Sequence, residues 1–364
     1  MKLPPKQVRI IHKILPYGVI SFVFGVIYLC IESGILGDST SYPSTGVSYN
    51  FAVSIIVLPI SALLFGLLIG TIETLYISNY FGRKSLLAKI ISKTSIYILS
   101  IVVFLLSTSL IANSINNDLD YLDPILWDTT AKFVFNGSFW SIVIFVASIV
   151  VISLLYAEFT AYLGQDVTEN FFRGKYHRPI EEERIFMFLD MKSSTTIAEK
   201  LGHLRYFEML QEYYIDLSDP IVDTRGLIYQ YVGDEIVVSW DMKKGLMDDN
   251  CFNCFVLMKK CLEEKSQKYH DKYGVIPTFK AGFHSGKVTT GEIGKIKKDI
   301  TFTGDVLNTT ARIQALCNSY DVDLIFSETI LFQLSSALQA RFNSLGKVEL
   351  RGKNAAVALH CLKN

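Results

Sequence analysis

The chain has 364 residues, of which 50% are hydrophobic and 19% charged, and its mean hydropathy is +0.32. A soluble chain carries about a quarter charged residues, so this composition excludes a disordered chain, a collagen-like chain and a purely cytosolic enzyme. The 35 basic residues balance the 35 acidic ones, and a net charge of zero gives no indication of nucleic-acid binding.

The charges are distributed unevenly along the chain. Residues 1–163 carry 9 basic and 8 acidic side chains, whereas residues 164–364 carry 26 and 27. This contrast predicts an apolar domain followed by a soluble domain of ordinary size. We expect a four-span transmembrane domain over residues 1–157, a juxtamembrane linker over 158–183 and a catalytic domain over 184–364.

Four stretches of the apolar half lack any charged residue over about the length needed to cross ~30 Å of hydrocarbon. They are Ile14–Ile31, Phe51–Ile72, Ser95–Ile115 and Phe133–Ala157. Lysines and arginines gather before the first stretch and between the second and third, and basic loops stay in the cytoplasm. The sequence therefore predicts a multi-pass protein of the cell (inner or plasma) membrane whose N-terminus and soluble domain are both cytoplasmic.

Two features near the cytoplasmic ends of the spans have more than one interpretation. Glu73 and Glu158 are either signal-coupling carboxylates or, as we favour, side chains at the level of the lipid headgroups. The basic and aromatic stretch 171–178 suits an anionic lipid surface. The fourth span either continues as a helix to about Gly174, which pairs in a dimer, or leads into a plain tether.

The soluble half alternates strand and helix patterns. Arg184–Asp190 is a short apolar run that predicts a buried strand ending at Asp190, and the hydroxyl run 193–196 is typical of a helix start. Two β-rich runs flank Gly233–Asp234, which indicates a hairpin turn. The further expected elements are helices over Leu204–Asp223, Met247–Lys272 and Gly304–Leu316, and a strand over Phe279–Ser285.

Asp190 at a strand end and Asp234 at a hairpin tip would face each other if their strands are neighbours. Two close carboxylates repel each other unless a divalent cation lies between them, and hard oxygen ligands select Mg²⁺ or Mn²⁺, which also holds phosphates. The hydroxyl-rich turn after Asp190 would receive an anion at a helix N-terminus. Together these features indicate a nucleotide site, although a Gly-Asp turn alone is weak evidence.

Five ordered motifs resemble those of the class III nucleotidyl cyclase catalytic domain over about Glu182–Leu362. The motifs are Phe188–Thr195 (FLDMKSST), Tyr231–Glu235 (YVGDE), Phe283–Val288 (FHSGKV) with Gly291–Gly294 (GEIG), Thr303–Arg312 (TGDVLNTTAR) and Leu350–Lys353 (LRGK). The resemblance implies an α+β ferredoxin-like fold and a homodimer whose two active sites each draw on both chains.

The same resemblance assigns roles to individual residues. It implies that Asp190 and Asp234, with the Met191 carbonyl, bind two Mg²⁺ or Mn²⁺ ions in each active site. The remaining implied roles are β/γ-phosphate binding by the amides of Ser193, Ser194 and Thr195, ribose orientation by Asn308, transition-state stabilisation by Arg312, and a grip on the triphosphate by Arg351 or Lys353. Asn308, Arg312 and the triphosphate-binding residue would come from the partner chain.

The base-recognition positions depart from the best-known patterns, which are Lys and Asp for adenylyl cyclases and Glu and Cys for guanylyl cyclases. Thr301, a residue type found there in many bacterial adenylyl cyclases, can accept a hydrogen bond from adenine N6. Gln230 can donate to adenine N1 or, flipped, face guanine. The missing Glu favours ATP. We therefore expect a membrane-bound adenylate cyclase whose partners are ATP, membrane lipids and a second copy of the chain; the alternatives are a guanylate cyclase and a catalytically silent nucleotide-binding receptor.

Overall fold

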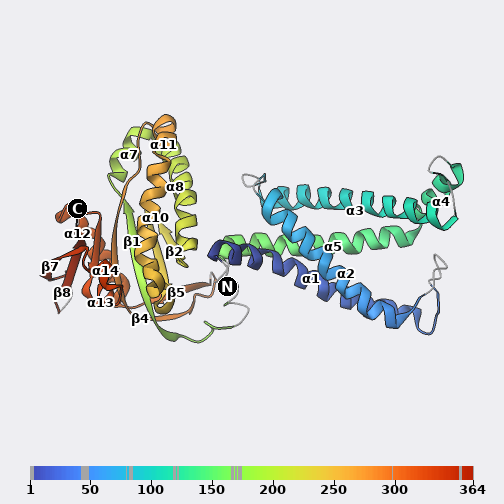
Figure 1. Ribbon diagram of the computed structural model, residues 1–364, viewed down its shortest axis with the longest axis horizontal. Coiled ribbons are helices and arrows are strands. Elements are labelled where there is room, and N and C mark those ends of the chain that lie inside the picture. Colours follow the sequence, from blue (N-terminus) through green and yellow to red (C-terminus); the bar gives the residue numbers. More distant parts are fainter. Residues whose placement is uncertain are drawn as a thin grey trace. The chain divides into compact units, whose positions relative to one another are not determined.

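A computed structural model of the chain describes residues 4–41, 49–78, 80–81, 85–117, 120, 123–164, 168, 170, 174–296, 298–351 and 355–363 (Figure 1). The chain divides into two compact units: residues 7–165 form one, and residues 166–364 the larger part of the other. The two units are described separately below.

All the regular elements that the structure describes in the apolar unit are helices. Its elements are α1 (Pro5–Leu36), α2 (Phe51–Ile72), a π-helix η1 (Glu73–Ile77), α3 (Leu86–Asn117), α4 (Pro124–Val134) and α5 (Gly137–Leu163). Four of these helical segments, Pro5–Leu36, Phe51–Ile77, Leu86–Ser107 and Gly137–Tyr162, are long and apolar enough to cross a membrane. The predicted start of the fourth span at Phe133 is wrong, because Asn136 caps α5 by accepting a hydrogen bond from the Ser138 amide at 2.9 Å.

The end of α5 contradicts a single helix running from the fourth span to Gly174. Gly164 has φ +87° and its amide still donates to the Thr160 carbonyl at 2.9 Å. This left-handed backbone region favours glycine and ends helices. Residues 171–173 of the predicted basic and aromatic stretch 171–178 lie outside the described residues, and Tyr176 is buried.

The second unit is built on one mixed sheet. Its strands are β1 (Ile180–Met191), β2 (Leu227–Val232), β3 (Glu235–Asp241), β4 (Phe279–Ile293), β5 (Asp299–Thr303), β6 (Leu324–Ser327), β7 (Phe342–Val348) and β8 (Val357–Leu362). The strand order is β2-β3-β1-β4-β6-β8-β7, with β5 paired to β4. The first four strands, with the helices between them, have the βαββαβ order of a ferredoxin-like fold, so the expected fold class is confirmed.

Helices cover both faces of this sheet. They are α7 (Ser194–Leu201), α8 (His203–Asp223), α9 (Met242–Leu246), the 3-10 helix η2 (Met247–Asp249), α10 (Asn250–Glu264), α11 (Ser266–Tyr273), α12 (Asp305–Ser319), α13 (Glu328–Leu331) and α14 (Ser336–Gln339). Helices α8 and α10 lie side by side (Figure 1).

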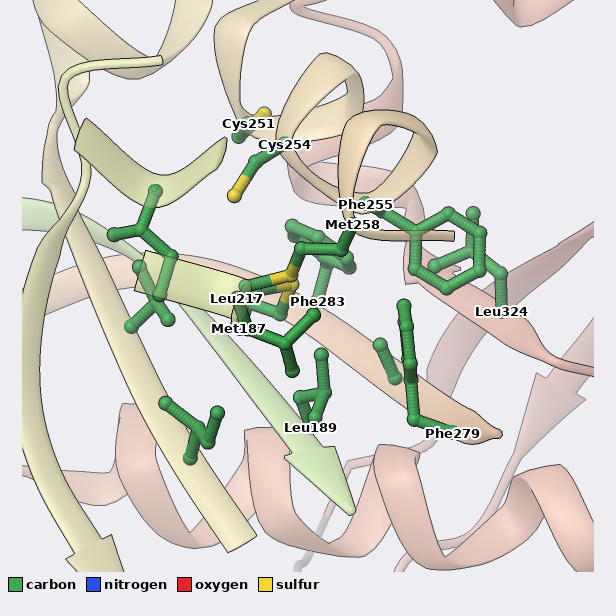
Figure 2. Packing of buried hydrophobic residues seen from close by; sticks show 14 of the residues in the cluster. Met187, Leu189, Leu217, Cys251, Cys254, Phe255, Met258, Phe279, Phe283 and Leu324 are labelled. Carbon is green, nitrogen blue, oxygen red and sulfur yellow. The ribbon is translucent and has the colours of Figure 1, made fainter. Parts of the chain in front are cut away.

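The side chains of β1 alternate between two hydrophobic clusters, as the period of two in a strand requires. Met187 and Leu189 belong to the larger cluster, which Leu217 of α8 and Phe255 of α10 complete (Figure 2). Phe186 and Phe188 point to the opposite face and join the smaller cluster, to which α12 also contributes. The central strand is therefore buried on both sides, and only its end is left to carry polar chemistry.

Two predicted elements differ from the structure in their limits, whereas the predicted helix Leu204–Asp223 keeps its end although it contains Pro220. The expected helix Met247–Lys272 begins only at Asn250, after two residues with φ +53°, and is interrupted at Lys265. The expected strand from Phe279 is fifteen residues long, because it pairs with β1 and then with β5. Pro220 does not shorten α8: the carbonyl of Asp216, four residues earlier, accepts a hydrogen bond from the Cys261 thiol at 3.2 Å instead.

Candidate active site

Strand register brings Asp190 beside the hairpin turn that holds Asp234. On β1, Asp190 pairs with Glu235 of β3 on one side and with Lys280 of β4 on the other. Gly233 and Asp234 form the two-residue turn between β2 and β3, and the φ of +61° at Gly233 is one that glycine adopts without strain. The Tyr214 hydroxyl donates to the Gly233 carbonyl at 2.5 Å and fixes the turn.

The carboxylates of this site influence one another electrostatically. Burial and the neighbouring Asp234 raise the pKa of Asp190, and the Lys280 ammonium, 3.3 Å from Asp190 Oδ2, opposes that rise. Burial, followed by the charges of the two aspartates, raises the pKa of Glu235 to about 7. The arrangement therefore concentrates negative charge at one end of β1.

The donor set fits a divalent cation. Asp234 Oδ2 is buried and has no hydrogen-bond partner among the residues that the structure describes. A buried carboxylate oxygen without a donor is costly, and a cation shared with Asp190 would satisfy it with the oxygen ligands that Mg²⁺ and Mn²⁺ prefer. The Met191 side chain lies in the core, so only its backbone could take part.

The turn after β1 is built to present backbone amides. Ser193 has φ +54° and ψ 30°, a left-handed conformation that is strained for a non-glycine residue and that clusters at functional sites. Helix α7 begins at Ser194, but the Ser193 hydroxyl makes no capping hydrogen bond, so the expected side-chain cap is wrong. The first amides of α7, including that of Thr195, lack intrahelical partners, as at any helix start, and such a turn suits an anion.

Helix α12 carries Asn308 and Arg312 one turn apart on a single face. Asn308 is exposed and Arg312 is half-buried. On the opposite side of the same helix, Gln314 donates to Asp190 Oδ2 at 3.4 Å. The helical period therefore directs Asn308 and Arg312 away from the carboxylates of their own chain.

Gln230 and Thr301 lie on strands that one tyrosine connects. The Tyr229 hydroxyl accepts a hydrogen bond from the Phe302 amide at 3.2 Å, and the two rings are 4.8 Å apart. Gln230 is exposed on β2, next to Tyr229, and Thr301 precedes Phe302 on β5. The contact joins β2 to β5 beside Gln230 and Thr301, the two residues predicted to recognise the base.

Two tyrosines and the two candidate triphosphate-binding residues complete the account of this domain. Tyr229 and Tyr231 do not share a sheet face: a β-bulge between Ile228 and Gln230 changes the alternation, and the Tyr231 ring packs 4.4 Å from that of Tyr214. Arg351 is exposed in a turn that follows β7. Lys353 lies outside the described residues.

Sequence reasoning gave no role to three residues beside the carboxylates: Lys280 and Gln314, which contact Asp190, and Glu235, its partner across the sheet. The Lys280 side chain is only 9% exposed, and its ammonium also donates to Asn318 Oδ1 at 2.8 Å. A lysine inside the predicted strand Phe279–Ser285 was the available signal, because a charged side chain that a sheet buries needs a partner.

A ferredoxin-like sheet with clustered carboxylates beside an anion-receiving turn is typical of enzymes that hold a nucleotide through divalent cations. The family described as the adenylate and guanylate cyclase catalytic domain matches residues 178–364, half of the chain, and the chain belongs to this family.

Individual relatives and a solved structure are similar to the same half. Adenylate cyclase 2 of Rhizobium meliloti is 34% identical over 197 residues, 54% of each chain. The adenylate cyclase of Anabaena cylindrica is 24% identical over 187 residues, 49% of this chain and 36% of the relative. The chain thus spans about half or less of these relatives' length. A bacterial light-regulated adenylyl cyclase shares the fold with a TM-score of 0.51 and 20% identity, covering 58% of this chain and 61% of that one.

Proposed function

We propose that the protein is a membrane-bound adenylate cyclase that converts ATP to 3′,5′-cyclic AMP and diphosphate. The observation that carries the proposal is the juxtaposition of Asp190 with Asp234, whose buried Oδ2 lacks a hydrogen-bond partner among the described residues. Membership of the cyclase family and the similarity to proteins named adenylate cyclases support it.

Asp190 and Asp234, with the Met191 carbonyl, would hold two Mg²⁺ or Mn²⁺ ions. When bound, such ions lower the pKa of the ribose 3′-hydroxyl and neutralise charge on the phosphates. The amides of the turn at Ser193, Ser194 and Thr195 would receive the β- and γ-phosphates. The ammonium of Lys280, fixed between Asp190 and Asn318, limits the repulsion between the carboxylates.

The reaction forms one phosphorus–oxygen bond and breaks another. The ribose 3′-hydroxyl loses its proton to water, its oxygen attacks the α-phosphorus in line, the bond to the β-phosphate oxygen breaks, and diphosphate leaves with that electron pair. Arg312 would stabilise the charge that develops on the phosphoryl oxygens, and Asn308 would orient the ribose. Since both face away from Asp190 of their own chain, we propose that they serve the partner's site in a homodimer, as does Arg351 or Lys353.

The membrane assignment belongs to the same proposal. Four helices of sufficient length and apolarity precede the catalytic domain. Basic residues precede the first helix and lie in the loop between the second and third helices. We propose that the helices anchor the protein in the cell (inner or plasma) membrane, among lipids, with the catalytic domain in the cytoplasm.

Substrate choice rests on Gln230 and Thr301. The link between β2 and β5 through Tyr229 keeps the two strands together, so both side chains can contact one base. A threonine hydroxyl accepts from adenine N6 or donates to guanine O6, so the discrimination comes from the missing glutamate, in whose place the chain carries Gln230. This chemistry favours ATP over GTP.

A turnover assay on the purified full chain tests the proposal. With Mn²⁺, we expect cyclic AMP from ATP, little cyclic GMP from GTP, and no product from Asp190→Asn. The matched control is Asp271→Asn, which changes an aspartate that is 65% exposed on α11. Preference for GTP would make the protein a guanylate cyclase, and nucleotide binding without turnover would make it a silent receptor.

A further inference from the structure

Five polar side chains of the apolar unit form one connected cluster, which we call the ion-pair network. Lys93 Nζ lies 2.5 Å from Glu73 Oε1 and 3.2 Å from Glu158 Oε1. Lys89 Nζ lies 3.3 Å from Glu158 Oε2, and the Tyr97 hydroxyl donates to Glu73 Oε2 at 2.9 Å. The network joins η1, α3 and α5, three segments that are distant in sequence.

The network is largely withdrawn from solvent. The side chains of Lys93 and Glu73 are 4% and 6% exposed, and that of Glu158 is 12% exposed. Glu73 and Glu158 are therefore not isolated carboxylates, because two lysines of α3 neutralise them inside the helix bundle. Removal of one partner leaves an uncompensated buried charge. A movement of one helix therefore has to keep each carboxylate paired with a lysine.

The two lysines offer Glu158 two adjacent binding positions. Lys89 and Lys93 are one turn apart on α3, a separation of about 6 Å along the axis, and Glu158 contacts both. Helix α5 carries Glu158 five residues before its last residue, Leu163, from which the chain leads on to β1. One-turn displacements of one packed helix along another are an established kind of switching motion.

Two observations beside the network favour a second arrangement. Glu73 is the first residue of the π-helix η1, and such bulges are frequent at functional sites. Tyr17, which is 2% exposed and belongs to the same buried cluster as Tyr97, has a buried hydroxyl without a hydrogen-bond partner among the described residues. That hydroxyl can serve Glu73 when the contact with Tyr97 is released.

We propose that the ion-pair network couples the membrane unit to catalysis: the pairing of Glu158 with Lys89 or with Lys93 corresponds to two positions of α5, and the position of α5 sets the turnover of the catalytic domain. This inference rests on the proposed cyclase function. It assigns to the apolar helices a regulatory role beyond that of an anchor.

The test compares variants of the full chain in lipid vesicles. Lys93→Met is expected to change kcat by about threefold or more while KM for ATP stays the same, whereas Lys93→Arg keeps the charge and the wild-type kcat. The matched control is Lys132→Met, since Lys132 pairs with Asp128 on the surface of α4, where both side chains are more than half exposed. A merely structural role would lower the melting temperature and leave kcat of the folded fraction unchanged.

A second readout does not depend on turnover. We expect Lys93→Met, but not Lys132→Met, to change amide hydrogen exchange over residues 174–191, which lead into and form β1. If Lys93→Met fails to fold, the double variant Lys89→Met/Glu158→Gln removes one charge of each sign, leaves the Lys93–Glu73 pair intact, and is expected to show the same two changes.

The outcomes separate the two proposals. Wild-type protein that makes no cyclic nucleotide refutes the proposed function, and the exchange measurement then decides the coupling alone. Unchanged kcat in active protein, or unchanged exchange in inactive protein, overturns the inference.

Discussion

At the scale of single residues, Asp234 combines a cost in stability with a proposed role in metal binding. Its buried Oδ2 lacks a partner among the described residues, and its charge raises the pKa of Asp190. We expect Asp234→Asn to lower kcat by about 100-fold or more, because a hard-cation ligand is lost. The same variant is expected to melt at a higher temperature than wild type in EDTA. Undiminished turnover, with the exposed-site variant Asp271→Asn as control, would contradict the role in metal binding.

Glu235 makes the stability of the metal-free protein depend on pH. Burial and the two aspartates raise its pKa from 4.5 to about 7 in the folded protein. Between these values the folded state binds more protons than the unfolded state, so stability falls as pH rises from about 4.5 to about 7 and stays low above that range. The raised pKa of Asp190 acts in the same direction.

We therefore expect Glu235→Gln to raise the melting temperature at pH 8 and to change it little at pH 5, in the absence of divalent cations. Glu349→Gln, at an exposed glutamate, serves as the control. Equal shifts at the two pH values would show that the effect does not come from ionisation of Glu235.

At the scale of elements, the site depends on the close approach of α12 to β4. A Cβ atom at Gly282 would lie 2.4 Å from the amide nitrogen of Gln314 and 2.7 Å from its Cα. Backbone atoms cannot rotate away, so the helix must move. We expect Gly282→Ala to destabilise the protein by about 1–3 kcal/mol and to lower activity, because Gln314 contacts Asp190.

The same strand provides the control for this experiment. A Cβ atom at Gly291 would meet Pro179 at an ordinary contact distance of 3.4 Å. Gly291→Ala is therefore expected to keep both the melting temperature and the turnover. Denaturant unfolding of the two variants measures the difference, and equal stabilities would show that α12 can shift without cost.

The elements also show which residues of the site can be predicted from local sequence patterns. An apolar run that ends at Asp190 and a Gly-Asp pair between β-rich runs are local signals, and the structure brings those two aspartates together. Glu235 and Lys280 were missed because they join the site through strand register, which pairs β1 with segments 45 and 90 residues further along the chain. Strand order depends on the packing of the whole sheet, and no single stretch of sequence contains it.

At the scale of the whole molecule, the same distinction holds for the apolar half. The spans were predictable because each is a continuous apolar run. The ion-pair network was not, because its members come from three segments and Lys89 and Glu158 are 69 residues apart. The interruption after α5 depends on one glycine, Gly164, which the surrounding apolar pattern did not mark as a helix end.

The proposed dimer predicts that two inactive variants complement each other. If each active site takes its metal ligands from one chain and Arg312 from the other, Asp190→Asn and Arg312→Ala are each inactive alone. A mixed dimer then contains one site with both defects and one intact site. Random pairing of equal amounts in a two-fold dimer puts half of the molecules in this mixed form, so co-expression is expected to restore about a quarter of wild-type activity.

Cyclic AMP formation by membranes from cells that co-express the two tagged variants measures this recovery. The control is co-expression of Asp190→Asn with Asp234→Asn. Both variants lack a metal ligand, so neither site of a mixed dimer is intact. Recovery with the first pair and none with the second requires a site shared between chains. Equal recovery from both pairs, or none from either, would mean that Arg312 acts within its own chain or not at all. The placement of Arg312 on the side of α12 opposite to Gln314 and Asp190 would then need another explanation.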